Sequence, residues 1–142
     1  MTDSIKQLSS IVKTSQIAQV TIHSIIGYAV CPGLKNALKL QLREYHSIER
    51  ETRSIAAARG WELEFLPLTA KLLASLMIRV QLSNGRVDSK IAAKIIQCNT
   101  KGMIKCFQNR NQQNRSDIPV AILSQKLLDC ETANIKQMQG FL

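Results

Sequence analysis

Residues 32–60, PGLKNALKLQLREYHSIERETRSIAAARG, contain the pattern that decides the fold class. Pro32 suits the first turn of an α-helix, and a glycine such as Gly60 is common just past a helix C-terminus. Between them, positions alternately four and three residues apart form one helical face. We therefore predict a single helix from Pro32 to Arg59. That face is made by Gln41, Tyr45, Ile48, Thr52 and Ile55.

The same helical period continues on both sides of this stretch, and no alternating strand pattern competes with it. Asp117 suits the cap of the last helix, and the polar tract 109–116 suggests a loop or a frayed helix end. Long helices with short connections pack antiparallel. We predict one domain, 1–142, that is all-α: an up-and-down antiparallel bundle of four long helices plus a fifth helix. The other predicted helices are 4–29, 61–82 (or from Pro67, after an irregular lead-in), 88–111 and 118–139, most of them 20 residues or longer, with a turn at 83–85.

The charge of the chain is large and uneven. The 142 residues have a net charge of +9, with nine basic residues and one acid, Asp88, between Lys71 and Arg115. Half of the acids lie in Glu44–Glu64. A basic surface favours soluble protein and attracts polyanions. The N-terminus has no signal-peptide pattern and the apolar runs are too short to span a bilayer, so we expect a cytoplasmic protein without a membrane partner.

The fourth predicted helix carries a strip of basic residues. On a helical wheel the rest of this helix is mostly apolar, so we expect it to be buried except along its basic edge. The simplest interpretation is a solvated edge, and the functional alternative is a surface for nucleic acid, another polyanion or an acidic protein. Nucleic-acid sites usually add arginines or stacking aromatics, and neither is interleaved here. The strip consists of Arg86, Lys90, Lys94, Lys101 and Lys105.

Glu131 falls inside the apolar arc of the last predicted helix, between Leu127 and Leu128 in angle. A buried carboxyl group is costly unless it is paired or hydrogen-bonded. Its possible partners are polar residues of the first and second helices. The sequence thus predicts a buried polar cluster of His23, Gln41, Tyr45 and Glu131, which is either a structural hydrogen-bond network or a ligand site.

The sequence has no recognisable catalytic or metal motif. A di-metal bundle needs Glu-x-x-His on two helices, but Val20 and Arg43 stand three residues before the two histidines, His23 and His46. Gly-flanked nucleophiles and phosphate-binding glycine loops are also missing from the sequence. We expect no catalytic activity, no cofactor and no metal. The cysteines form no Cys-x-x-Cys pair and are expected to be reduced thiols: Cys31, Cys98, Cys106 and Cys130.

Four stretches resemble a known set of proteins: 45–51 (YHSIERE), 56–63 (AAARGWEL), 99–105 (NTKGMIK) and 125–131 (QKLLDCE), together with the ending Phe141-Leu142. In these the chain is similar to small uncharacterised helical-bundle proteins of Gram-positive anaerobes. The resemblance extends over most of the chain from about residue 34. It implies a bundle that is ferritin-like in outline, and it implies no particular activity.

Three functions follow as expectations. The first is a non-enzymatic interaction or structural protein that self-associates through the wide apolar arc of the third and fourth helices. The second is a polyanion or nucleic-acid binding module that uses the basic strip. The third is a degenerate ferritin-like metal-binding protein with its site around Glu44, Glu131, His23 and His46.

Overall fold

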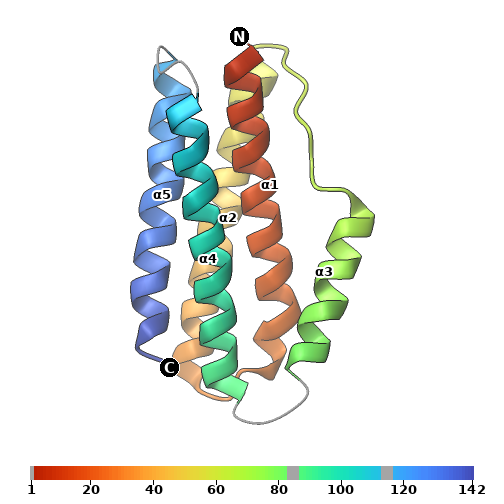
Figure 1. Ribbon diagram of the computed structural model, residues 1–142, viewed down its shortest axis with the longest axis vertical. Helices are drawn as coiled ribbons and strands as arrows, with labels where there is room; N and C mark the ends of the chain where they lie inside the picture. Colours follow the sequence, from red (N-terminus) through yellow and green to blue (C-terminus); the bar gives the residue numbers. More distant parts are fainter. Residues whose placement is uncertain (1, 83–86, 113–116) are drawn as a thin grey trace.

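The computed structural model describes residues 2–82, 87–112 and 117–142, and these ranges contain helices and no strand (Figure 1). The all-α prediction is therefore confirmed. Within the same ranges, no helix has the length and the apolar run needed to cross a bilayer. The α-helices are α1 (Thr2–Ile25), α2 (Pro32–Ala58), α3 (Leu68–Gln81), α4 (Val87–Gln112) and α5 (Ile118–Gln139), and a short 3-10 turn (Ile26–Tyr28) follows α1.

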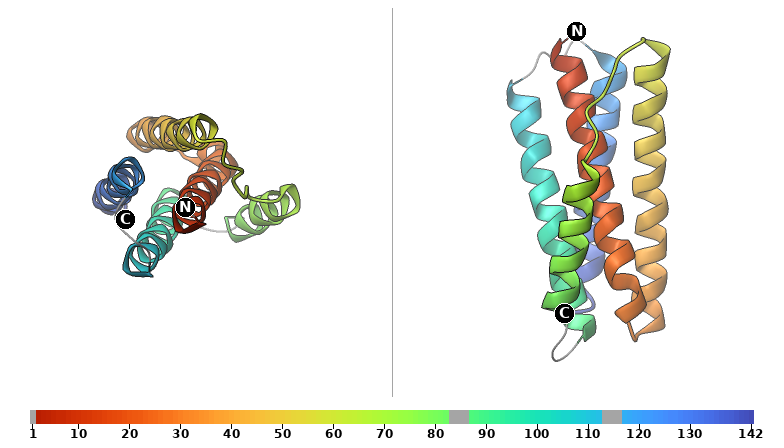
Figure 2. Two further views of the ribbon diagram at one scale, coloured as in Figure 1. Left: turned by 90° about the horizontal axis from the view of Figure 1, so that it is seen from above. Right: turned by 90° about the vertical axis from the view of Figure 1, so that its right-hand side faces the viewer.

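Four helices form the body of the molecule, and α3 lies outside them (Figures 1 and 2). Helix α1 packs against α2 and α4, and α5 packs against the same two helices. Each of these four pairs runs antiparallel, because α2 and α4 run in one direction and α1 and α5 in the other. The largest fully buried side chains come from all four helices and include Leu8, Ile22, Leu38, Ile95 and Leu127.

The end of α2 follows the glycine pattern that the sequence predicts. Gly60 has a φ of +65°, in the left-handed region that glycine adopts at little cost. Its N–H donates to the Ala57 carbonyl (3.2 Å), and the Trp61 N–H donates to the Ala56 carbonyl (2.9 Å). These two bonds close the helix by the Schellman arrangement.

Residues 61–67 are extended, so the predicted lead-in is present and α3 begins only after Pro67. Helix α3 has 14 residues, so the longer range 61–82 is wrong and the alternative that starts at Pro67 is close to the structure. Side chains of α1 hold the extended segment: Ser9 Oγ accepts from the Glu64 N–H (3.0 Å), and Gln16 Oε1 accepts from the Leu66 N–H (2.8 Å). These bonds satisfy two backbone N–H groups that have no partner within the extended segment itself.

Helix α3 has an unusual distribution of side chains. Towards α1 it presents small residues such as Ala74 and Ser75, and Ser75 forms a hydroxyl–hydroxyl bond with Ser24 (2.9 Å). Ile78 is the large residue that it buries, with 4% of its surface exposed. The larger apolar side chains are 54–70% exposed, which is the reverse of an ordinary amphipathic helix, and one of them, Met77, also lines the space between α3 and the bundle. We call them the outer face of α3: Leu68, Leu72, Leu73, Leu76, Met77 and Val80.

Helix α4 is less buried than the sequence suggests. The expectation that it shows solvent only a basic edge is wrong, because Ile104 is 51% and Phe107 47% exposed. In the bundle α4 packs against α1 and α5, which leaves a further part of its circumference uncovered. Asn109 lies within α4, while residues 113–116 and the predicted turn at 83–85 fall outside the described residues.

Candidate functional site

The centre of the bundle contains a polar group on Tyr45 of α2. This side chain is fully buried, and Glu131 of α5 is only 1% exposed. The Tyr45 hydroxyl oxygen lies 2.8 Å from Asn99 Oδ1 of α4 and 2.9 Å from Glu131 Oε2. It also accepts a hydrogen bond from Asn134 Nδ2 of α5 at 3.2 Å. One hydroxyl thus joins three helices, and we call these four residues the Tyr45 network.

With Asn99 Oδ1 turned towards the Tyr45 hydroxyl, as the structure has it, the number of protons in the Tyr45 network indicates a neutral Glu131. A hydroxyl group has one hydrogen to donate, so Tyr45 cannot donate to both Asn99 Oδ1 and Glu131 Oε2. If the carboxyl group is protonated, Glu131 donates to Tyr45 while Tyr45 donates to Asn99, and every contact has one hydrogen. Burial raises the pKa of Glu131 to about 8, although the bond to Tyr45 acts in the opposite direction. Both arguments favour the uncharged acid at neutral pH.

The structure brings together two of the four residues expected in one polar cluster. Tyr45 and Glu131 are bonded, but His23 is exposed near the end of α1. Gln41 is buried and donates to Gln137 Oε1 (3.2 Å), one helical turn away from Tyr45. The expectation is therefore wrong for His23 and Gln41. The polar positions of α1 are spread round the helix, so their pattern did not show that His23 faces solvent.

Sequence reasoning missed Asn99, Asn134 and Gly102. A Cβ atom on Gly102 would lie 2.7 Å from Glu131 Oε1 and 3.1 Å from Thr14 Cγ2, so the glycine makes room for the carboxyl group. A signal for two of them was present, because Asn99 and Gly102 interrupt a buried stripe of α4 at helical spacing. That stripe is Ile91, Ile95, Asn99, Gly102 and Cys106.

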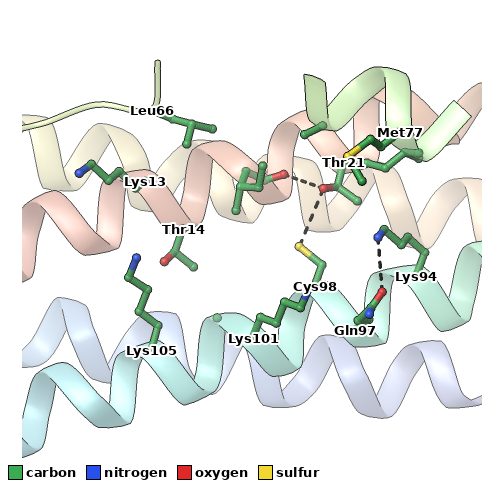
Figure 3. A pocket seen from close by; sticks show the side chains of 14 residues that line it. Lys13, Thr14, Thr21, Leu66, Met77, Lys94, Gln97, Cys98, Lys101 and Lys105 are labelled. Carbon is green, nitrogen blue, oxygen red and sulfur yellow. Dashed lines mark hydrogen bonds between the residues drawn. The ribbon is translucent and has the colours of Figure 1, made fainter. Parts of the chain in front are cut away.

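Three lysines of the basic strip border a pocket between α1, α3 and α4 (Figure 3). The pocket has a volume of about 370 Å³. Lys94, Lys101 and Lys105 line it from α4, and Lys13 joins them from α1. Lys90 lines a second pocket of about 380 Å³, which shares Ile78, Lys94 and Gln97 with the first. Arg86 lies outside the described residues.

The pocket is positively charged. Lys13 is paired with Glu64 (2.8 Å), whose side chain is 80% exposed, and Lys94 Nζ donates to Gln97 Oε1 (3.4 Å). Within the described part of the chain, neither Lys101 nor Lys105 forms a salt bridge. None of the described residues that line the pocket is an Asp or a Glu. Four ammonium groups therefore lie round a space in which the lining supplies no carboxylate.

Gly102 borders both this pocket and the Tyr45 network. Gly102 and Thr14 line the pocket, and the space beside Gly102 on its other side is filled by the Glu131 carboxyl group. Cys98 also lines the pocket, and burial raises the pKa of its thiol to about 11. A thiol with that pKa stays protonated at neutral pH and is a poor nucleophile.

The remaining sulfur and acidic groups show no metal arrangement. Among residues 2–82, 87–112 and 117–142, no group of three or more His, Cys, Asp and Glu side chains could hold a metal ion. Glu44 Oε2 accepts a hydrogen bond from the Cys130 thiol (3.1 Å), and His46 is exposed. Burial and the neighbouring Glu44 raise the pKa of Cys130. All four cysteines are free.

Comparisons of the chain with models of protein families, with curated proteins and with solved structures found no match.

Proposed function

We propose that this chain is a non-enzymatic interaction protein that self-associates through the outer face of α3. The observation that supports the proposal is the reversed distribution of side chains on this helix. Six large apolar residues that are more than half exposed share one half of the circumference of this short helix, whereas exposed apolar residues on monomers are usually scattered. Burial in an interface would remove these side chains from water, which is favourable.

A second copy of the chain fits this face better than a partner of different chemistry. Leu73, Leu76 and Val80 follow the three-and-four spacing with which helices pair along a seam. The charged residues of α3 are Lys71, which is half-buried on the side near α1, and Arg79. Arg79 is exposed and lies between Leu68 and Leu72 in angle, so two outer faces that meet about a two-fold axis would bring together one arginine from each copy but no row of like charges, despite the net charge of +9.

We also propose that the bundle is ferritin-like in outline and cytoplasmic. The first part is supported by the connection from α2 to α4, because these two helices run in the same direction and residues 59–86 join them across the bundle. Ferritin-like folds contain one such long crossover among four helices. The second part is supported by the four free cysteines, which suit a reducing compartment.

The double substitution Leu72→Glu/Leu76→Glu is expected to abolish self-association. Both residues belong to the outer face, and a charge placed in an apolar interface must be desolvated without a partner. Light scattering coupled to size exclusion, at tens of micromolar protein, should give about twice the chain mass of 15.9 kDa for the wild type. The variant should give the mass of one chain.

Leu40→Glu/Ile122→Glu is the matched control. These leucine and isoleucine residues are 51% and 64% exposed on α2 and α5, and the double substitution changes the net charge by the same amount. This control variant should give the same measured mass as the wild type, about that of two chains. A wild type that is monomeric throughout this range, or a control variant that dissociates equally, would show that the outer face of α3 is not the interface.

A further inference from the structure

We propose that the pocket under α3 binds a single-chain anionic amphiphile of the fatty-acid class. Two features of the pocket fit such a ligand: several apolar lining residues, and the ammonium groups of the four lysines that also line it. This inference goes beyond self-association and does not depend on it, because the residues of the pocket and those of the outer face coincide only at Met77.

The charge of the site selects an anion. Lys101 and Lys105 come from successive turns of α4, and Lys13 faces them from α1 across Thr14 (Figure 3). Glu64, the partner of Lys13, is 80% exposed, so this ion pair is weak and an incoming anion can share the Lys13 ammonium group. A carboxylate at this position would gain charge-assisted hydrogen bonds that the described lining residues do not provide for one another.

The interior of the site selects an apolar body. Opposite the lysines of α4, the lining comes from α1, from the extended segment and from α3 (Figure 3). Leu66 is held in place because its backbone N–H is bonded to Gln16 (2.8 Å), so this part of the wall is fixed. The apolar lining residues are Ile17, Leu66, Ala74, Met77 and Ile78.

The shape of the site favours a chain over a compact anion or a nucleic acid. The two pockets share Ile78, Lys94 and Gln97, so they are neighbours along α4 on the side that faces α3. An extended alkyl chain can follow such an elongated lining, and each methylene that it buries adds to the binding. None of the described residues that line either pocket is aromatic, so a base would find no stacking partner.

Calorimetric titration of the full chain with laurate, below the concentration at which laurate forms micelles, tests the proposal. We expect saturable binding of one laurate per chain. Lys101→Gln/Lys105→Gln should weaken the binding about tenfold or more, because both ammonium groups are lost while the apolar walls remain. Lys35→Gln/Lys39→Gln, at two exposed positions of α2, is the matched control and should bind as the wild type does.

Three further titrations separate this site from the alternatives. Dodecanol, which has the chain without the charge, and inorganic phosphate, which has the charge without the chain, should each bind at least tenfold more weakly than laurate. Leu72→Glu/Leu76→Glu should retain the affinity, because these residues do not line the pocket. The proposal would be overturned if laurate showed no saturable binding, or if phosphate or dodecanol bound as tightly as laurate. Loss of laurate binding in Leu72→Glu/Leu76→Glu would also overturn it. So would a single-stranded oligonucleotide that binds more tightly than laurate and depends on Lys101 and Lys105.

Discussion

Replacement of Glu131 by Gln is expected to make the protein more stable at pH 8 by on the order of 4 kcal/mol, with little effect at pH 5. Glutamine has the shape of glutamic acid, and its amide can donate to Tyr45 as the protonated carboxyl group does. The Tyr45 network therefore stays complete. What the substitution removes is the proton that the folded wild type must bind.

The sign of this stability change follows from the pKa of Glu131 in the folded protein and in the unfolded chain. The pKa is about 8 in the folded protein, against 4.5 for an ordinary glutamate. Between these values the unfolded chain has lost the proton while the folded chain keeps it, so the wild type loses about 1.4 kcal/mol of stability per pH unit as the pH rises. The contribution of Glu131 to the stability is fully present below about pH 4.5. It is lost progressively as the pH rises from there to about 8. The variant lacks this slope.

Urea unfolding of both proteins at several values from pH 5 to pH 8 measures the difference. Glu64→Gln is a suitable control, because Lys13 holds the pKa of Glu64 below its usual value and this group titrates below the range. The control should keep the slope of the wild type. Parallel curves for the wild type and Glu131→Gln would mean that Glu131 is ionised in the folded protein.

Gly102→Ala is expected to destabilise the protein by about 2 kcal/mol, as overpacking of a filled interior usually does. The new Cβ atom would lie 2.7 Å from Glu131 Oε1, so an atom must move. Glu131 is buried and bonded to Tyr45, which leaves it little room to turn away. In an open helix the same substitution would stabilise by roughly 1 kcal/mol, so the sign of the effect is informative.

Gly33→Ala is the matched control, because a Cβ atom there meets its nearest neighbour, Cys31 Sγ, at an ordinary 3.6 Å. It should be neutral or slightly stabilising by thermal unfolding. In a Glu131→Ala background, Gly102→Ala should cost at least 1 kcal/mol less than in the wild type, because the crowding oxygen is gone. Equal costs in both backgrounds would show that Glu131 does not fill the space beside Gly102.

The helix ends could be predicted from the sequence because single residues determine them. Pro32 and Gly60 have backbone preferences that hold in any context, and α2 begins and ends where they place it. The length of α3 depended instead on contacts between distant residues. The bonds from Ser9 and Gln16 to the extended segment join positions 50 or more apart, and local patterns carry no information about them.

The candidate sites were predictable to different degrees. Glu131 stood out because an acid in an apolar arc needs a partner, and Tyr45 was among the residues proposed for it. The pocket could not be predicted, because Lys13 and the lysines of α4 meet only through the packing of α1 against α4. The wide apolar arc of α3 could be read from the sequence, but such an arc does not indicate which part of the helix faces the bundle.

The most direct test of self-association through α3 is amide hydrogen exchange measured at several protein concentrations. A helix that packs only along one side opens readily, so its amides exchange fast in a single chain and slow down when an interface covers it. We predict that protection of residues 68–81 rises from low to high micromolar protein, while exchange in the exposed part of α2 stays constant. Exchange of α3 that does not depend on concentration in this range would contradict the proposal.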